Sequence, residues 1–329
     1  MSRENMRENP IQGKRLRAMD LFCGAGGSTC GAKAAGVQVV GAVDAWDLAC
    51  MTYRENHPGA KIYHSTCEQL DPNLVQREVG PIDILLASPE CTNHTCAKGA
   101  AERCEASKNT AFQVVRFARR LQPRWIVIEN VIQMRTWERY EELIEDLEGE
   151  GYHCAPHVLN AVDFGVPQSR RRLFVVCQRE SAPPPIVLPE ARKRTAREIV
   201  DTNGTYRYSP LRTARRASGT IERAERAIAE VGERHPFLLV YYGSDGAGGW
   251  QRLSVPLRTI TTLDRFAYVR SRNGAHEMRM LQVEELKSAM GFPADYVFRV
   301  GTRRDRIKLI GNAVCPPVMA HIVKNLVNE

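Results

Sequence analysis

Short apolar runs alternate along the first half of the chain with segments whose apolar residues recur every three or four positions. The apolar runs occupy residues 17–22, 39–43, 61–63, 82–87, 125–128 and 173–177. Their length and nearly continuous hydrophobicity are typical of strands buried on both faces of a parallel sheet. Strands that alternate with helices at this spacing predict an α/β fold with a doubly wound, mostly parallel sheet.

Two segments between these runs have the periodicity of amphipathic helices. Residues 111–121 place alanine, valine and leucine on one face. The other face carries Arg116, Arg119 and Arg120, which we expect to be solvated. A second helical pattern begins at Trp137 and is closed by glycines at 149 and 151.

The first predicted strand opens into the glycine-rich segment Cys23-Gly24-Ala25-Gly26-Gly27. Glycines there permit a tight turn and a close approach of the backbone to a ligand, although a glycine run alone is weak evidence. The second strand ends at Asp44, roughly 20 residues downstream, where an acidic side chain binds ribose hydroxyls in this kind of fold. Asp44 is alternatively the N-cap of a helix over residues 48–56, and Trp46 is either a core residue or a platform for adenine.

Cys91 follows the apolar run 82–87, which Ser88-Pro89 brings to an end. In an open α/β sheet, ligands bind beyond the carboxyl ends of the strands. An inert thiol in a turn is the simpler interpretation of a single cysteine. However, the apolar run 125–128 ends at Glu129, which can place a carboxyl group beside the thiol. A nucleophile and a potential general acid on neighbouring strand ends form a reactive pair.

A polar loop over residues 92–109 follows this cysteine and has the length of a lid. It contains Cys96 and Cys104, which with Cys91 and His94 are a conceivable zinc set. The spacing lacks the C-x2-C knuckle of structural zinc sites, so we disfavour a metal.

The second half of the chain is rich in proline and arginine. Residues 183–189 predict a linker, and the arginines that follow predict a second, basic and less regular domain. We expect strands at 237–242 and 257–262 around a glycine-rich loop. Helices are expected at 283–290 and 317–327, the latter after a turn over 310–314.

The composition of the chain narrows the class of protein but does not indicate a particular function. A chain of 329 residues with 26% charged and 43% hydrophobic residues is ordinary for a soluble protein of one large and one smaller domain. No apolar run has the length of a membrane span, and the polar start of the chain lacks a signal-peptide core. Ten irregularly spaced cysteines favour reduced thiols in a cytosol, and the net charge of +8 weakly favours a polyanionic partner.

Taken together, the motifs resemble those of the DNA cytosine carbon-5 methyltransferases. The matching segments are, in chain order, Asp20-Leu21-Phe22-Cys23-Gly24-Ala25-Gly26-Gly27, Ser88-Pro89-Glu90-Cys91, Glu129-Asn130-Val131, Gln168-Ser169-Arg170-Arg171-Arg172, Pro256-Leu257-Arg258-Thr259-Ile260-Thr261-Thr262, and Gly291-Phe292-Pro293 with Gly311-Asn312-Ala313-Val314. Each motif is modest alone, but six in the right order are highly specific.

The resemblance implies a Rossmann-like class I methyltransferase fold. Residues 1–180 would form the catalytic and cofactor domain, 181–282 a smaller target-recognition domain, and 283–329 a segment returning to the catalytic domain. It implies S-adenosyl-L-methionine as cofactor, with S-adenosyl-L-homocysteine as product, and double-stranded DNA as substrate. The implied cofactor residues are Asp20, Phe22, Gly24, Gly26, Gly27, Asp44, Trp46, Asn312 and Val314. The implied DNA-binding residues are Lys98, Gln168, Tyr242, Arg252, Arg258 and Arg265.

The resemblance also implies the catalytic roles. Cys91 would add to carbon 6 of a flipped-out cytosine, and protonated Glu129 would hydrogen-bond ring nitrogen 3. Arg172 would contact the carbonyl oxygen of the base, and Arg170 would steady the same pocket. The chain departs from the family at Glu90, where proline usually precedes the cysteine, and at Thr92, where glutamine usually follows. It also lacks the acid that commonly follows the third strand, with Ser65 or Thr66 in that place.

Three other functions compete with this hypothesis. A tRNA methyltransferase of the same superfamily would use the same basic second domain, because phosphate attraction carries no sequence information. A catalytically inactive DNA-binding relative is disfavoured because thiol, acid and cofactor turn are all present. A Rossmann oxidoreductase is disfavoured because the first turn lacks a full G-x-G-x-x-G. We expect a cytoplasmic monomer with no membrane contact, and a cognate restriction endonuclease is a candidate partner.

Overall fold

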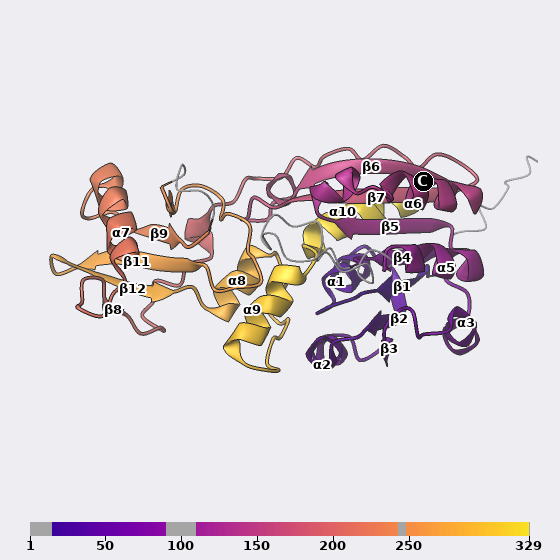
Figure 1. The fold of residues 1–329 in the computed structure, drawn as a ribbon, viewed down its shortest axis with the longest axis horizontal. Helices are drawn as coiled ribbons and strands as arrows, with labels where there is room; N and C mark the ends of the chain where they lie inside the picture. Colours follow the sequence, from indigo (N-terminus) through magenta and orange to yellow (C-terminus); the bar gives the residue numbers. More distant parts are fainter. Residues whose placement is uncertain (1–14, 90–109, 243–247, 329) are drawn as a thin grey trace, which may run out of the picture.

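The computed structural model describes residues 15–89, 110–242 and 248–328. Its larger sheet has seven strands in the order β3-β2-β1-β4-β5-β7-β6 (Figure 1). The strands are β1 (Arg17–Leu21), β2 (Gln38–Asp44), β3 (Lys61–His64), β4 (Ile84–Ala87), β5 (Trp125–Asn130), β6 (Tyr152–Asn160) and β7 (Arg171–Arg179). Neighbours from β3 to β5 are parallel, and β7 is antiparallel to both β5 and β6. The predicted mostly parallel, doubly wound sheet is therefore confirmed.

Helices cover both faces of this sheet because its central strands are apolar on both sides. All residues of β4 and β5 are buried. The helices α1 (Gly27–Ala34) and α10 (Pro316–Val327) share one apolar core with the sheet. The helices α3 (Pro72–Val79), α5 (Phe112–Leu121) and α6 (Tyr140–Gly149) share the core of the other face. Helix α2 (Asp47–Asn56) follows β2, and its Tyr53 packs in a small cluster with Cys23.

Three details of this half differ from the sequence-based expectations. Strand β5 continues through Asn130, so Glu129 lies within the strand rather than beyond it. Helix α6 begins at Tyr140, and Trp137 lies in the turn before it. Arg116 is not solvated as expected, because its guanidinium folds back to donate to the carbonyl oxygens of Cys67 and Leu70.

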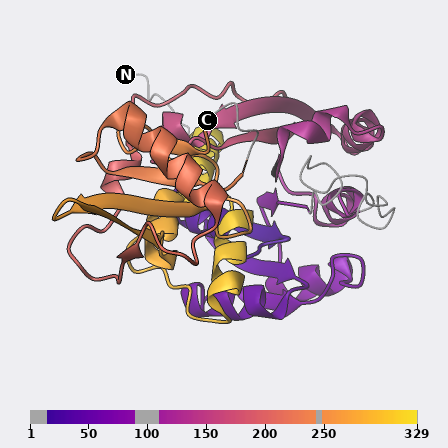
Figure 2. The same cartoon turned by 60° about the vertical axis from the view of Figure 1, so that its left-hand side comes forward.

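A second sheet of five strands is built from residues of the arginine-rich half. Its order is β10-β9-β11-β12-β8, and its neighbouring strands are antiparallel. The strands are β8 (Ser209–Pro210), β9 (Phe237–Val240), β10 (Trp250–Arg252), β11 (Phe266–Arg272) and β12 (Ala275–Met280). Helix α7 (Ser218–Val231) lies across one face of this sheet, as Figure 2 shows, and buries Ala224, Ala227 and Ile228 against it. This half is more regular than the sequence suggested.

Two predictions for the second half of the chain are wrong. Residues 257–262 do not form a strand; within them only Leu257 makes an isolated bridge, to Gln168. The expected turn over 310–314 is in part the end of helix α9 (Arg303–Asn312), which the sequence analysis missed. Helix α8 (Val283–Ala289) and α9 lie between the two sheets (Figure 1).

The predicted proline-rich linker packs against α10, one of the helices that cover the larger sheet. Carbonyl oxygens of Pro185 and Val187 accept hydrogen bonds from Asn325 and His321 on α10. The segment 182–195 has no helix or strand of its own. Within the described ranges, no helix combines the length and hydrophobicity that crossing a membrane would require.

A buried ion pair joins the second sheet to the helices beside it. Arg279 on β12 binds Glu285 on α8 through two hydrogen bonds of 2.6 and 2.7 Å. The two residues are 5% and 3% exposed. Glu285 also accepts the backbone N–H groups of Asp201 and Gln282, so the charge of this carboxylate is fully compensated.

We predict that Arg279→Met destabilises the protein by about 3–5 kcal/mol, because it leaves the carboxylate of Glu285 buried without its cation. Urea unfolding followed by circular dichroism measures the change. The matched control is Arg270→Met, which breaks an ion pair with Glu277 whose side chains are 22% and 23% exposed. The control should cost no more than about 1 kcal/mol. Equal losses in the two variants would contradict the prediction.

Candidate functional site

The carboxyl ends of β4 and β5 lie side by side. Ala87 pairs with Ile128, so the residues after β4 run beside Glu129. The side-chain amide of Asn130 donates to the carbonyl oxygen of Pro89 at 3.2 Å. Cys91 stands two residues further along the chain but lies outside the described residues, as do Lys98 and the cysteines and histidine of the conceivable zinc set.

Glu129 faces an arginine in a small pocket. Its carboxylate lies 3.2 Å from the Nε of Arg172. Strands β5 and β7 pair Glu129 with Phe174, so Arg172, two residues earlier, extends on the same face of the sheet. Burial raises the pKa of Glu129, although the charges of Arg172 and Arg170 oppose the shift. A carboxyl group held in this way can keep its proton and donate it to a bound base.

Arg170 lines the same pocket but points its guanidinium at the backbone. It is 3% exposed and donates to the carbonyl oxygens of Ile260, Gly311 and Ala313 over 2.9–3.2 Å. These contacts favour a role in positioning the pocket over direct contact with a substrate.

Gln168 cannot bind DNA as the sequence analysis expected. It is fully buried, and its side chain accepts from the N–H of Ile260 and donates to the carbonyl oxygen of Ala289. The side chain instead ties residue Ile260 to Ala289 at the end of α8. A buried polar residue with satisfied hydrogen bonds cannot be told from a surface contact in the sequence alone.

Asp44 closes the glycine turn that follows β1. Its carboxylate accepts the N–H of Gly24 and the N–H of Trp46, each at 2.8 Å. Helix α2 has Trp46 as its N-cap residue and no side-chain cap, so the expected N-cap role of Asp44 is wrong. Phe22 and Gly24 both have positive φ angles, of 56° and 53°, and a Cβ on Gly24 would meet no atom within 4 Å. The turn is therefore tight, with open space at Gly24 for a ligand.

Asp20 lies on β1, just before this turn, and is fully buried. It pairs with Leu86 on the neighbouring strand β4. One carboxylate oxygen accepts the hydroxyl of Thr29 at 2.7 Å. The other oxygen has no hydrogen-bond partner among the described residues. Burial raises the pKa of Asp20 to about 7, despite the hydrogen bonds from Thr29. An orphaned, buried oxygen of this kind suits a polar group of a bound cofactor.

The C-terminal helices complete the surroundings of the turn. A Cβ on Gly27 would lie 2.3 Å from the carbonyl oxygen of Val314, so α1 and the segment before α10 are in direct contact. Asn312 is exposed at the end of α9. Trp46 is half-buried against the core, and the Nζ of Lys308 lies 4.5 Å from the centre of its ring. Two residues that no sequence motif pointed to, His57 and Tyr296, contact the carbonyl oxygens of Gly26 and Ala25 in the turn. Lys33 in turn contacts His57.

The predicted DNA-binding residues of the second half lie near one another in sequence but differ in exposure. Arg252 is exposed and donates to the carbonyl oxygen of Glu230. Arg265 and Arg258 are half-exposed, and Arg265 donates to the carbonyl oxygen of Tyr241. Tyr242 is half-buried, and its hydroxyl donates a hydrogen bond of 2.6 Å to the carbonyl oxygen of Thr259. Residues 243–247 of the glycine-rich loop lie outside the described residues.

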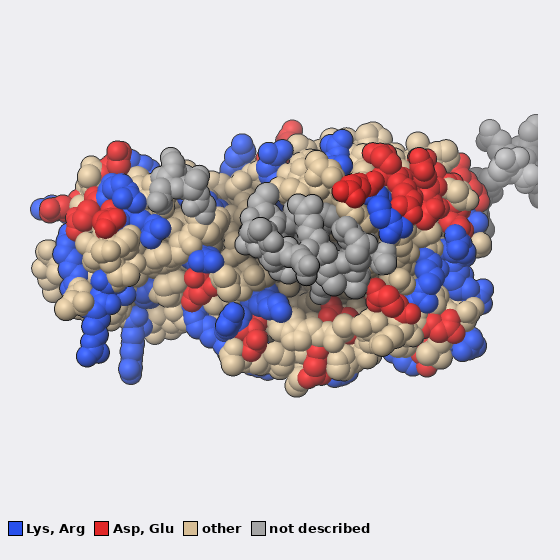
Figure 3. All heavy atoms as spheres, in the orientation of Figure 1, with Lys and Arg blue, Asp and Glu red and all other residues tan. Residues whose placement is uncertain are grey.

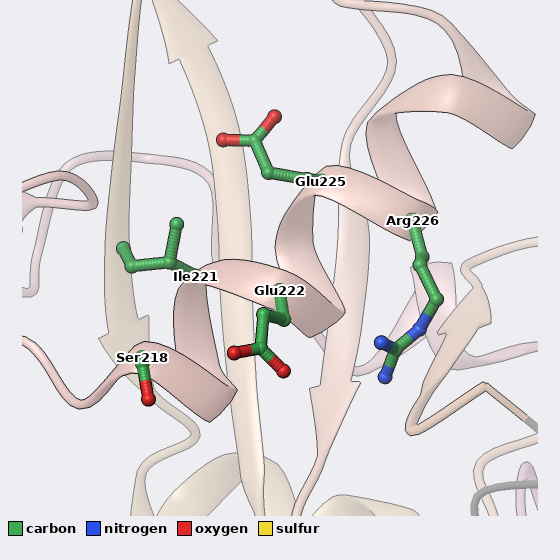
Figure 4. Close-up of a pocket in the computed structure, with 5 residues that line it drawn as sticks. All are labelled: Ser218, Ile221, Glu222, Glu225 and Arg226. Atoms are coloured by element: carbon green, nitrogen blue, oxygen red, sulfur yellow. The ribbon is translucent and has the colours of Figure 1, made fainter.

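A second depression lies on the outer surface of α7 (Figure 4). Ser218, Ile221 and three charged residues line it; Glu225 extends upward in the close-up, whereas Glu222 and Arg226 extend downward. Because it is open and far from the strand ends of the larger sheet, it is not a candidate catalytic site.

Comparisons with known proteins agree with this geometry. The family model for C-5 cytosine-specific DNA methylase matches residues 16–328. The chain is 28% identical to the Type II methyltransferase M.HgiDI of Herpetosiphon aurantiacus, covering 91% of this chain and 90% of that protein. It is 27% identical to the Type II methyltransferase M1.HphI of Haemophilus parahaemolyticus, covering 95% and 86%.

Solved structures share the fold. The Entamoeba histolytica methyltransferase EhMeth superposes with a TM-score of 0.71 at 16% identity, over 96% of this chain and 98% of that one. Because the family model spans nearly the whole chain, the chain belongs to the C-5 cytosine-specific DNA methylases and is an S-adenosyl-L-methionine-dependent DNA (cytosine-5-)-methyltransferase.

Proposed function

We propose that this enzyme methylates a cytosine that has been flipped out of duplex DNA, through a covalent adduct with Cys91. The observation that carries the proposal is the buried carboxyl group of Glu129, held by Arg172 beside the chain that leads to Cys91. Carbon 5 is a poor nucleophile in free cytosine, and carbon 6 is hidden inside a stacked duplex. Addition of a thiol with help from a protonated acid would answer the first difficulty, and flipping the base out of the duplex would answer the second.

The proposed reaction balances as follows. The Cys91 thiolate adds to carbon 6 while Glu129 donates its proton toward ring nitrogen 3, which makes carbon 5 nucleophilic. Arg172 stabilises the carbonyl oxygen of the base. S-adenosyl-L-methionine, when bound, supplies the methyl group that carbon 5 takes up. Loss of the carbon 5 proton to a base then expels the Cys91 thiolate, and the proton on ring nitrogen 3 returns to Glu129. The aromatic ring is restored, with S-adenosyl-L-homocysteine as the second product.

We place the cofactor at the glycine turn. The open side of Gly24 gives room for the ligand, and Asp20 offers an unpartnered carboxylate oxygen. Asp44 and Trp46 would meet the ribose and the adenine, while Phe22, Gly26, Gly27, Asn312 and Val314 would form the walls. Asp44 would bind the ribose while it holds the turn, because a carboxylate can accept several hydrogen bonds.

We assign residues 1–180 to catalysis and cofactor binding, 181–282 to target recognition, and 283–329 to a segment returning to the catalytic part. Most of the net charge of +8 lies in the middle segment. Acidic side chains gather over α6, at the other end of the molecule (Figure 3). This asymmetry supports an approach of DNA from the side of the second sheet, since the α6 surface repels phosphates.

Double-stranded DNA is the substrate we favour over tRNA, because the matching family model and curated relatives are DNA methylases and Type II methyltransferases. The names of those relatives support a role in restriction-modification, with a cognate endonuclease as genetic partner. We propose a monomer in the cytoplasm. The seven cysteines within the described ranges are all free thiols, which suits a reducing compartment.

Cys91→Ser should abolish methyl transfer and leave the affinity for S-adenosyl-L-methionine unchanged, because the thiol acts on the base and not on the cofactor. The wild-type enzyme should form an adduct with DNA containing 5-fluorocytosine that survives denaturation. Cys96→Ser is the matched control and should still form the adduct. An adduct that persists in Cys91→Ser and vanishes in Cys96→Ser would refute the assignment.

Glu129→Gln should lower the single-turnover rate by about a hundredfold or more, because an amide cannot deliver the proton. The wild-type rate should fall as pH rises through the raised pKa of Glu129, since the acid loses its proton there. The variant should lack that limb of the pH profile. A near-normal rate for the variant at neutral pH would show that Glu129 is not the acid.

The recognition surface should be small and carried by the region from Tyr241 to Phe266. If Arg252 or Arg265 reads a base, its change to alanine should cost roughly 1–3 kcal/mol and relax sequence preference at one position. If it binds phosphate, the change should weaken all sequences alike. Mapping methylated cytosines in cells that express each variant separates the two outcomes. An unchanged site pattern in both variants means that neither arginine reads a base.

A further inference from the structure

Two side chains from distant parts of the sequence, His57 and Tyr296, contact the backbone carbonyl oxygens of the glycine turn. We call this pair of residues the brace. The hydroxyl of Tyr296 donates to the carbonyl oxygen of Ala25. The Nε2 of His57 lies 3.3 Å from the carbonyl oxygen of Gly26 and 2.9 Å from the Tyr296 hydroxyl oxygen. His57 and Tyr296 are 3% and 5% exposed. The turn is thus held through the N–H of Gly24 by Asp44 and through the carbonyl oxygens of Ala25 and Gly26 by these two side chains.

Lys33 on α1 fixes the state of this histidine. Its Nζ lies 3.5 Å from the Nδ1 of His57. An ammonium group can only donate, so Nδ1 accepts and the ring hydrogen resides on Nε2. Burial and the charge of Lys33 lower the pKa of His57 to about 4, so the ring stays neutral at physiological pH. Neutral His57 therefore presents an N–H to Tyr296 and to the turn.

Aromatic packing holds both side chains in place. The His57 ring makes edge contacts with Tyr53 and Tyr296, with ring centres 4.8 and 5.5 Å apart. Tyr296 also packs on Phe292 at 4.6 Å. His57 directly follows α2, and its N–H donates to the carbonyl oxygen of Tyr53. The brace thus joins α2 to the segment between α8 and α9.

The fit at Gly26 leaves no room for adjustment. A Cβ there would lie 2.6 Å from the Nε2 of His57 and 2.7 Å from the hydroxyl oxygen of Tyr296. Gly26 has a φ of 87°, a conformation that other residues rarely adopt. The two side chains and the glycine therefore specify one another, and together they select a single shape of the turn.

We propose that His57 and Tyr296 are positioning residues for S-adenosyl-L-methionine, which act by holding the turn over residues 24–27 in its binding shape. Neither residue stands in the motifs by which the chain resembles its family. The inference rests on the proposed cofactor site. A turn that is already ordered loses less conformational freedom when a ligand binds, so the brace should strengthen cofactor affinity and leave the chemical step unaffected.

The test removes one hydroxyl. Tyr296→Phe keeps the ring packing but loses the hydrogen bonds to Ala25 and His57, and should raise both the KM and the Kd for S-adenosyl-L-methionine about tenfold. The kcat at saturating cofactor and the Kd for DNA should stay within about twofold. His57→Leu should show the same split between KM and kcat. His57→Gln, which retains an N–H donor, should recover most of the affinity.

The matched control is Tyr152→Phe. Tyr152 is also a buried tyrosine, and its hydroxyl donates to the carbonyl oxygen of Pro123 at 2.7 Å, on the face of the sheet that α6 covers. This variant should lose similar thermal stability without a change in cofactor Kd. An equal loss of affinity in Tyr152→Phe and Tyr296→Phe would overturn the inference, since general loosening would then explain both.

Asp44→Ala separates this inference from the assignment of the cofactor site. If Asp44→Ala weakens cofactor binding and Tyr296→Phe does not, the positioning role fails while the cofactor site stands. If Asp44→Ala leaves the Kd for S-adenosyl-L-methionine unchanged, the site itself is misplaced and the inference falls with it.

Discussion

The buried guanidinium of Arg170 is the contact that joins the separate parts of this enzyme into one site. A buried cation is costly unless its donors find acceptors, and Arg170 reaches three backbone carbonyl oxygens from two distant segments. One belongs to Ile260, and two belong to Gly311 at the end of α9 and to Ala313 directly after this helix. Any movement of these segments away from β7 would leave the charge uncompensated.

That constraint ties the base pocket to the cofactor turn. Arg170 binds the carbonyl oxygens of Gly311 and Ala313, and Ala313 directly precedes Val314 in the chain. The carbonyl oxygen of Val314 in turn lies against Gly27. Two residues further along the chain, Arg172 faces Glu129. One short segment of sequence therefore links the position of Glu129 to that of the glycine turn.

The sequence predicted six of the seven strands of the larger sheet, because the central strands are apolar on both faces and their pattern is nearly continuous. It missed β6, most of whose residues are only half-buried or exposed. It failed at residues 257–262, where β-branched residues suggested a strand. The N–H of Ile260 is instead taken by the Gln168 side chain and its carbonyl oxygen by Arg170. Helix α9 was missed because its first half is a run of charged residues. The brace of His57 and Tyr296 leaves no local pattern, since 239 residues separate its members.

Two buried carboxyl groups at the functional edge show how surroundings divide roles between like residues. Burial raises the pKa of both Asp20 and Glu129. Glu129 faces the guanidinium of Arg172, whose positive charge opposes the effect of burial on its pKa. Asp20 is bonded to Thr29, which also contacts Tyr53, and keeps one oxygen unpartnered within the described structure. The two carboxyl groups therefore differ in what they face, a guanidinium for Glu129 and a hydroxyl group for Asp20.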